Sequence, residues 1–239
     1  MSALAPKASL ADSLVRQFGG RYSSELGIDV DAGDDEVERW FLASTLFGTR
    51  ISARIAERTF HQLTRAGINR ISDAGRSDWD TLVALLDAGG YARYDFRTAR
   101  RLQALSEVVG DRYHGEIGEI GRRCTDPATL VARLDDLPGW GPVTVGLFLR
   151  ELRGTWPGAL LPLDPRAADA ARHLGLLTGR ERDSLACIER IAGQAGRDQR
   201  DVEAALVRFG LAHRRAAGCP GGRLCVMLGA GPAHPPRGK

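Results

Sequence analysis

The sequence predicts an all-α protein, and three observations lead to this fold class. Apolar residues recur along most of the chain at the three- to four-residue spacing of amphipathic helices. Residues that favour helix starts and glycines that favour helix ends bound these segments. The connections are short, no segment alternates convincingly as a strand does, and no repeat recurs at a fixed period.

The composition is that of a globular protein with enough apolar residues for one large core or two small ones. The chain has 239 residues, 43% of them hydrophobic, and a net charge of +3. Affinity for nucleic acid would therefore come from local arginine clusters rather than from a basic bulk. Lys7 and Lys239 are the only lysines, so 31 of the 33 basic residues are arginines, whose forked guanidinium suits phosphate. A GC-rich genome would produce the same bias without any mechanism.

Helix starts can be assigned along the N-terminal half. Asp34 and Asp35 favour a start before a strongly apolar stretch, and Ser52 favours the next start. Residues 77–80 resemble a capping box with aspartate in place of glutamate. The expected helices are residues 9–17, a helix through Phe47, a helix after Ser52, a helix that ends at Gly89 and Gly90, and residues 96–109 with Arg97, Arg100 and Arg101 facing outward.

Two helices joined by a tight turn are expected over residues 127–153. Asp126 is a good N-cap and Pro127 a good first helical residue, so a helix should run from 127 to 137. Gly139 and Gly141 can take positive φ in the turn, and proline at the next position favours a second helix that runs to about residue 153.

The turn has the features of a phosphate-binding site. Two glycines leave backbone N–H groups uncovered, and the second helix adds roughly half a positive charge at its N-terminus. An ordinary helical hairpin with glycine at a C-cap is the alternative, and it would explain a lone Pro-Gly pair. Gly-x-Gly with the aromatic Trp140 at an exposed tip, followed by Pro142 and Thr144, is more specific. The expected contacts with a nucleic-acid backbone are Leu137, Pro138, Gly139, Trp140, Gly141, Val143 and Thr144.

Asp164 lies 23 residues beyond Gly141 and directly before Pro165. The pair is typical of an N-cap followed by the first helical residue, and this role alone would explain it. A carboxylate at a helix N-terminus is also kept ionised, so it could stabilise a developing sugar cation or deprotonate a water molecule. Further helices are expected near residues 166–174, 182–192 and 200–212.

The stretch Leu137-Pro138-Gly139-Trp140-Gly141-Pro142-Val143-Thr144, followed by Leu163-Asp164-Pro165-Arg166-Ala167, resembles the signature of the helix-hairpin-helix DNA glycosylase superfamily, in particular the endonuclease III branch. The resemblance implies a two-lobed helical fold with a cleft between the lobes. The first lobe would be a six-helix barrel, residues 35–153, that ends in the hairpin. Residues 1–34 with 154–218 would form the second lobe, and residues 219–239 a C-terminal loop and tail.

The resemblance also implies roles for individual residues. Asp164 stands at the position of the catalytic aspartate, and the hairpin would bind the DNA backbone, in some relatives through an alkali cation. Bifunctional relatives carry a lysine where this chain has Val143. The resemblance therefore implies a monofunctional enzyme without Schiff-base lyase activity.

The base pocket is less well marked. Thr49 and Arg50 lie in the loop that fills the gap left by the flipped base in relatives, but a plain helix-to-helix loop explains them equally well. Ser44 stands where the adenine-specific branch has its glutamate, which argues against adenine excision. Tyr91, Arg93 and Arg166 are further candidate DNA contacts, although the tyrosines of the 90–95 loop would also suit the edge of a core.

The cysteines argue against an iron–sulfur cluster. Cys219 and Cys225 resemble the last two ligands of the superfamily's cluster loop, but the first two positions fall at Phe209 and Ala216. A zinc site of His213, Cys219, Cys225 and His234 is chemically allowed but lacks a standard spacing. We therefore expect a metal-free loop and no cofactor beyond an alkali cation at the hairpin.

The resemblance implies a monofunctional DNA glycosylase, which we expect to act as a monomer on double-stranded DNA with a damaged or mismatched base. A deaminated pyrimidine is favoured by analogy, and an oxidised or alkylated purine is the alternative substrate. A non-catalytic binder of bent or damaged DNA, with Asp164 only as a cap, is the alternative from another class. No secretory signal and no apolar run of about 18 residues is present, so we expect a cytoplasmic, nucleoid-associated protein without a membrane segment.

Overall fold

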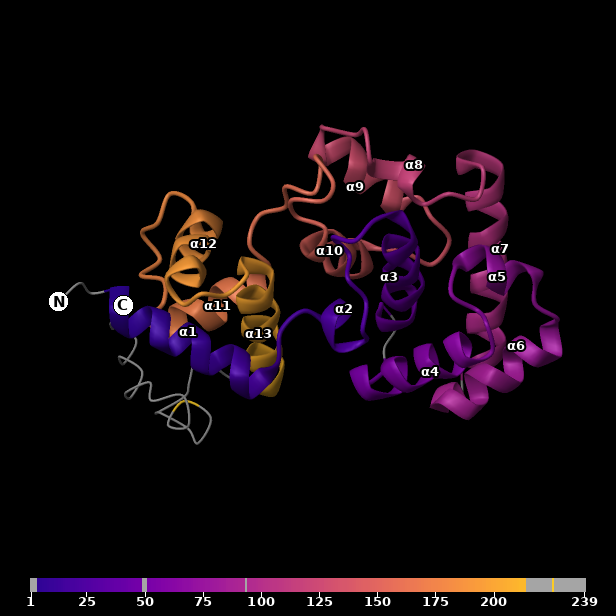
Figure 1. The fold of residues 1–239 in the computed structure, drawn as a ribbon, viewed down its shortest axis with the longest axis horizontal. Helices are drawn as coiled ribbons and strands as arrows, with labels where there is room; N and C mark the ends of the chain where they lie inside the picture. Colours follow the sequence, from indigo (N-terminus) through magenta and orange to yellow (C-terminus); the bar gives the residue numbers. More distant parts are fainter. Residues whose placement is uncertain (1–3, 49–50, 93, 214–224, 226–239) are drawn as a thin grey trace, which may run out of the picture. The chain divides into compact units, whose positions relative to one another are not determined.

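The computed structural model of the protein describes residues 4–48, 51–92, 94–213 and 225. Within these ranges the chain is helical and has no strand, which confirms the predicted all-α class (Figure 1). None of the helices in the described ranges combines the length and the apolar character that crossing a membrane requires. The chain divides into two compact units, residues 26–161 and residues 1–25 with 162–239.

The unit of residues 26–161 carries the hairpin and is built around α3. Its elements are α3 (Asp34–Phe47), α4 (Ala53–Arg65), α5 (Ile71–Arg76), α6 (Trp79–Leu86), the π-helical turn η1 (Asp87–Tyr91), α7 (Asp95–Tyr113), α8 (Gly118–Gly121), α9 (Pro127–Asp135) and α10 (Pro142–Glu151). α3 contacts α4, α5, α8 and α10, which explains why it is apolar on nearly every side.

Aromatic side chains join α3 to α10 and to the segment beyond it. The rings of Phe41 and Phe148 meet edge to face with centroids 5.6 Å apart, and Trp156 meets Phe148 in the same way at 5.4 Å. Trp40 is fully buried, and its Nε1 donates to the carbonyl of Phe148 over 3.2 Å. These contacts fix the helix that follows the turn against the centre of the unit.

The second unit carries Asp164. Its elements are α1 (Leu4–Phe18), α2 (Tyr22–Glu25), α11 (Pro165–His173), α12 (Ser184–Gln194) and α13 (Gln199–Ala212). α1 begins five residues earlier than predicted, so Lys7 lies inside this helix, and its Nζ donates to the carbonyl of Leu176 over 2.9 Å.

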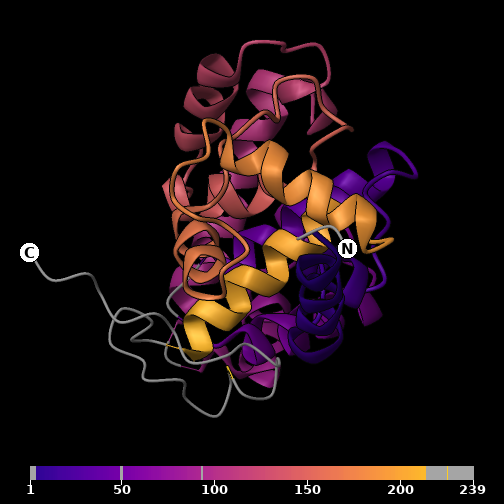
Figure 2. The same cartoon turned by 90° about the vertical axis from the view of Figure 1, so that its left-hand side faces the viewer.

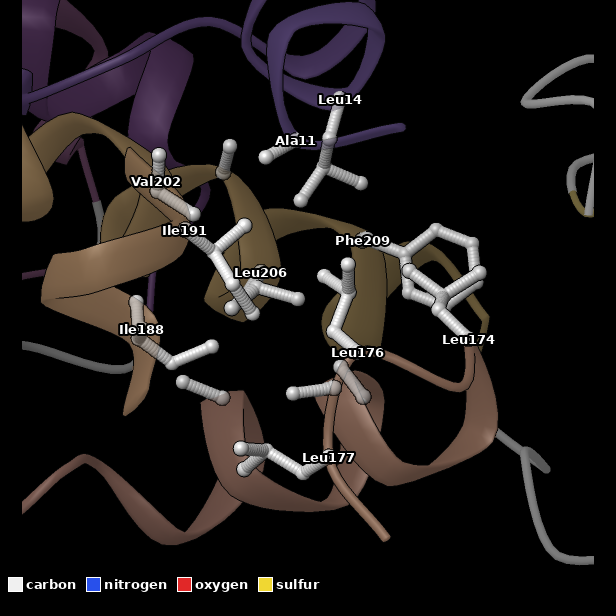
Figure 3. Packing of buried hydrophobic residues seen from close by; sticks show 14 of the residues in the cluster. Ala11, Leu14, Leu174, Leu176, Leu177, Ile188, Ile191, Val202, Leu206 and Phe209 are labelled. Atoms are coloured by element: carbon white, nitrogen blue, oxygen red, sulfur yellow. The ribbon is translucent and has the colours of Figure 1, made fainter. Parts of the chain in front are cut away.

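The core of the second unit forms where α1, α11, α12 and α13 pack together. Figure 3 shows Leu14, Ile191, Leu206 and Phe209 pointing into one shared apolar interior. α13, the yellow helix in Figure 2, contacts α1, α11 and α12. It is therefore the central helix of this unit.

α11 and α13 run side by side in the same direction. At their starts, the backbone N–H of Asp164 donates to Oε1 of the buried Glu203 over 2.9 Å. At their ends, the Nε2 atoms of His173 and His213 are 3.2 Å apart. Gly210 of α13 lies in this contact, because a Cβ there would be in van der Waals contact with the carbonyl oxygen of Arg166, at 3.4 Å.

Most predicted helix starts are confirmed. Ser52, Asp126 and Asp164 are N-caps whose side chains accept a backbone N–H. Two caps differ from the prediction by one position. Asp78 rather than Ser77 caps α6, and Gly33 rather than Asp34 precedes α3. The short helices α2, α5 and α8 were not predicted, since four to six residues carry too little periodicity.

Candidate functional site

The turn between α9 and α10 contains one glycine in a left-handed conformation. Gly139 has φ +76°, as predicted, which only glycine adopts readily. Gly141 has φ −165° and ψ 179°, an extended conformation open to any residue, so the prediction of a positive φ there is wrong. A Cβ at Gly141 would meet nothing within 4 Å.

The side chain of Arg101, from α7, packs against the turn at Gly139. A Cβ at Gly139 would lie 2.0 Å from Cδ of Arg101, so glycine is required for close packing as well as for φ. Nη2 of Arg101 donates to the carbonyl of Thr45 over 2.8 Å, near the C-terminal end of α3. Burial lowers the pKa of Arg101 from its ordinary value. The expectation that this arginine faces outward is therefore wrong, whereas Arg97 and Arg100 are exposed.

The side chain of Trp140 is a core residue and not an exposed tip. It is 7% exposed, stacks on Phe41 with ring centroids 4.4 Å apart, and meets Phe148 edge to face. Its Nε1 donates to Oγ1 of Thr45 over 3.1 Å. We correct the prediction accordingly: the ring anchors the turn to α3 because burial satisfies both its apolar face and its donor.

The other side chains of the turn are either buried against the core or exposed to solvent. Leu137 and Thr144 are buried, and Thr144 packs so closely on Gly48 that a Cβ there would lie 2.0 Å from Oγ1 of Thr144. Pro138 is half-buried. Val143 is 62% exposed and points away from the core. Packing thus holds one side of the turn, and the side next to Gly141 and Val143 is left accessible.

Backbone N–H groups are the polar groups that this accessible side offers. Among the described residues, no acceptor is found for the N–H groups of Gly139, Gly141, Val143 and Thr144. α10 has no side-chain N-cap, so the partial positive charge of its N-terminus is uncompensated. An anion such as a phosphate would satisfy these donors.

Asp164 lies at the N-terminus of α11 in the other unit. Its Oδ1 accepts the N–H of Arg166 over 2.8 Å, and Pro165 occupies the first helical position. The side chain of Asp164 is half-buried, while that of Arg166 is exposed. Glu203 holds the Asp164 backbone from below. The carboxylate is therefore fixed in place and reachable, which a charge stabiliser or general base requires.

The candidate base-pocket residues have different outcomes. Ser44 is fully buried in α3, and its Oγ has no hydrogen-bond partner in the described part of the chain. Tyr91 is fully buried and its hydroxyl donates to the carbonyl of Leu46 over 2.9 Å, so its side chain packs in the core. Thr49, Arg50 and Arg93 lie outside the described residues.

One cluster in the second unit was only partly anticipated. His213 and Cys225 were named as weak metal candidates, but His173 was not, although its Nε2 lies 3.1 Å from Sγ of Cys225. Cys219 and His234 lie outside the described residues. Nothing in the spacing of residues 173, 213 and 225 signals this cluster, because tertiary packing of α11 on α13 creates it.

No protein-family model matches the sequence, and no curated protein matches it significantly. The functional conclusion therefore depends on the residues, on their geometry and on the motif resemblance.

Proposed function

We propose that the protein is a monofunctional DNA glycosylase that hydrolyses the N-glycosidic bond of a damaged or mismatched base in double-stranded DNA. The observation that carries the proposal is the turn before α10, where a left-handed Gly139, an open Gly141 and an uncapped helix present unbonded N–H groups. In a DNA-binding protein, such a turn contacts phosphate and supplies position and affinity without sequence preference.

Asp164 is the group we assign to the chemical step. Cleavage of the C1′–N bond leaves its electron pair on the base and develops positive charge on the sugar. A fixed carboxylate would stabilise that charge, orient a water molecule towards C1′ and accept the proton that the water loses. The base must leave the stack for this reaction, at a cost of a few kcal/mol that is smallest at a mismatch or lesion.

Side-chain chemistry argues for hydrolysis without strand cleavage. A lyase needs an amine beside the sugar, and Val143 stands where bifunctional relatives have theirs. Lys7, one of only two lysines in the sequence, lies in α1, and its Nζ donates a hydrogen bond to the carbonyl of Leu176. Arginine does not deprotonate in proteins and cannot take the role.

The residues of this chain fit one of the two cofactors of the related glycosylases, the alkali cation, better than the other, the iron–sulfur cluster. Residues 137–141 carry no side-chain oxygen, so an alkali cation at the turn would be held by backbone carbonyl oxygens alone. A four-cysteine iron–sulfur cluster does not fit, because the fully buried Phe209 stands at the first ligand position. No step of the reaction requires either group.

The alternative is a binder of damaged DNA without catalysis. The contact that favours it is the hydrogen bond from the N–H of Arg166 to Asp164, because a helix cap accounts for this carboxylate without any reaction. Assays of base excision and of DNA binding distinguish the glycosylase from the non-catalytic binder.

The deciding experiment is a single-turnover assay on duplexes that each contain one lesion, treated with alkali to reveal abasic sites. The panel should contain deaminated and mismatched pyrimidines and oxidised and alkylated purines. Alkali-dependent breaks at one class of lesion would support the glycosylase and name its substrate. Selective binding in the same salt without any excision would support the binder.

A further inference from the structure

Three side chains that the proposed reaction does not use converge on one point. His173 ends α11, His213 directly follows α13, and Cys225 belongs to the same buried cluster as both helices. Nε2 of His173 lies 3.1 Å from Sγ of Cys225 and 3.2 Å from Nε2 of His213, which is 3.3 Å from the same sulfur. The three atoms form a nearly equilateral triangle.

Hydrogen bonds alone do not account for such a triangle. In a given protonation state, an imidazole nitrogen either carries a proton and donates or carries a lone pair and accepts. The thiol can donate one proton and accept one. Two linear hydrogen bonds are therefore the most that these three atoms can form among themselves, and the third contact is left unbonded. A cation at the centre would instead receive a lone pair from all three.

The separations match those of ligands on a tetrahedral ion. Zinc holds imidazole nitrogen at about 2.0–2.1 Å and thiolate sulfur at about 2.3 Å, so neighbouring ligand atoms on a tetrahedron lie roughly 3.3–3.6 Å apart. The observed separations run from 3.1 to 3.3 Å, and slight outward rotations of the side chains would reach the ideal values.

The surroundings preorganise the three groups. Cys225 is 1% exposed, and both imidazoles are half-buried. Phe209 packs against each imidazole, with centroids 6.1 Å from that of His173 and 5.1 Å from that of His213. An apolar wall of this kind holds the rings in one orientation and limits competition from water.

We propose that His173, His213 and Cys225 bind a zinc ion. Two imidazoles and a thiolate are donors that zinc prefers, and the fourth position of its tetrahedron is left for a group other than these three. The ion would join the C-terminal ends of α11 and α13 to Cys225. It would therefore act as a structural link in the unit that carries Asp164.

An iron–sulfur centre would place these groups differently. A centre with two histidines and two cysteines binds its imidazoles to one iron and its thiolates to the other. The imidazole nitrogens and the sulfur would then not converge on a single point. The observed separation of 3.3 Å or less between each nitrogen and the sulfur favours a mononuclear site.

The test uses the full chain without an affinity tag. The protein is reduced, stripped of metal with a chelator, loaded with zinc and dialysed to remove unbound zinc. We expect one zinc per chain by elemental analysis, and a Tm that rises with zinc. Replacing zinc with cobalt should produce a thiolate-to-cobalt charge-transfer band. His173→Gln, His213→Gln and Cys225→Ser should each weaken zinc binding by about 100-fold or more, since loss of even an outer partner typically costs about 10- to 100-fold.

Cys187→Ser and His114→Gln are the matched controls. Cys187 is a partly buried cysteine packed against the same core, and His114 is an exposed histidine of the other unit. Both variants should bind zinc as the wild type does.

Three results would overturn the proposal. They are a wild type that retains no zinc after dialysis, histidine variants that bind zinc as tightly as the wild type, and purified protein that contains iron and sulfide. If Cys225→Ser fails to fold by circular dichroism, the two histidine variants decide, because their side chains lie at the edge of the core. None of these readouts depends on glycosylase activity, so the two proposals can fail separately.

Discussion

The starts of α10 and α11 share a proline at the first helical position but differ in the residue before it. At α10 this residue is Gly141, which supplies no side-chain cap, whereas at α11 it is Asp164, whose Oδ1 accepts the N–H of Arg166. One helix N-terminus is thus open to an external anion, and the other is closed by its own. The difference indicates that α10 is suited to hold a phosphate and α11 to hold a carboxylate.

The start of α9 shows what such a cap does without a proposed reaction. Asp126 precedes Pro127 as Asp164 precedes Pro165, and its Oδ2 accepts the N–H of Thr129 over 2.9 Å. Two aspartate caps of the same local sequence therefore occur in one chain. Only Asp164 stands at the position that the resemblance assigns to a catalytic residue, so each cap serves as the control for the other.

The largest effect is expected from Asp164→Asn. Asparagine keeps the size and the capping oxygen, so Tm should change little. Loss of the negative charge removes the stabilisation of the sugar cation and the acceptor for the water proton. The single-turnover excision rate should fall by about 100-fold or more.

Asp126→Asn is the matched control for that substitution. It should leave the excision rate at the wild-type value, because it changes a cap of the same sequence without touching the reaction. Equal losses in the two variants, or full activity in Asp164→Asn, would mean that Asp164 is only a cap.

The local part of the fold was predictable from sequence. Asp126 and Asp164 could be assigned as caps because a short acceptor before a proline satisfies an N–H two or three residues ahead, whatever the tertiary structure. Gly139 could be assigned for the same reason, since only glycine fits a left-handed turn readily.

Features that depend on tertiary contacts were not predictable. Trp140 looked like an exposed tip, because nothing nearby in the sequence indicates that Phe41 and Thr45 will cover it. Arg101 resembled its exposed neighbours but inserts beneath the turn. Glu38 likewise gives no sign that burial will raise its pKa to about 7, although the N–H of Ile117 donates to it.

Gly141→Asp should give the second largest effect, because it turns the open start of α10 into a closed one. The extended backbone and empty space at Gly141 accommodate the side chain, which can cap the helix, so Tm should stay the same or rise. A carboxylate at the phosphate position should weaken binding to every duplex by about 10-fold or more in the same salt.

Gly110→Asp adds the same charge in α7, where a Cβ also meets nothing within 4 Å, and should leave affinity nearly unchanged. Fluorescence anisotropy with lesion-containing and undamaged duplexes provides the measurement. Wild-type affinity in Gly141→Asp would refute the phosphate role, and so would a loss confined to one lesion.

Because Val143 stands where the bifunctional relatives have a lysine, the third prediction is that the wild type has no lyase activity. The product should be intact abasic DNA, and borohydride should trap no covalent complex. Val143→Lys adds an amine at the second position of α10, where the side chain is exposed and the fold should tolerate it. Gain of borohydride trapping in that variant would place residue 143 beside the sugar.

An adduct in the wild type would contradict this expectation, and Lys7→Arg distinguishes its source. If the adduct disappears in Lys7→Arg, the amine of α1 would be the nucleophile. Such a result would require the hydrogen bond from Lys7 to Leu176 to break in the complex.

The smallest expected effect is a change in Tm when the cap at the start of α9, Asp126, is removed. Hydrogen bonds from the side chain and then the backbone of Thr129 lower the pKa of Asp126. A depressed pKa in the folded state contributes stability above the unfolded value of about 3.9, and this contribution is lost as pH falls through the folded value. Asp126→Ala should therefore have a slightly lower Tm than the wild type at about pH 6, and the gap should narrow towards about pH 3. A gap that stayed constant over this range would mean that the cap acts through packing rather than charge. High salt should also narrow the gap, because Asp126 is exposed to solvent.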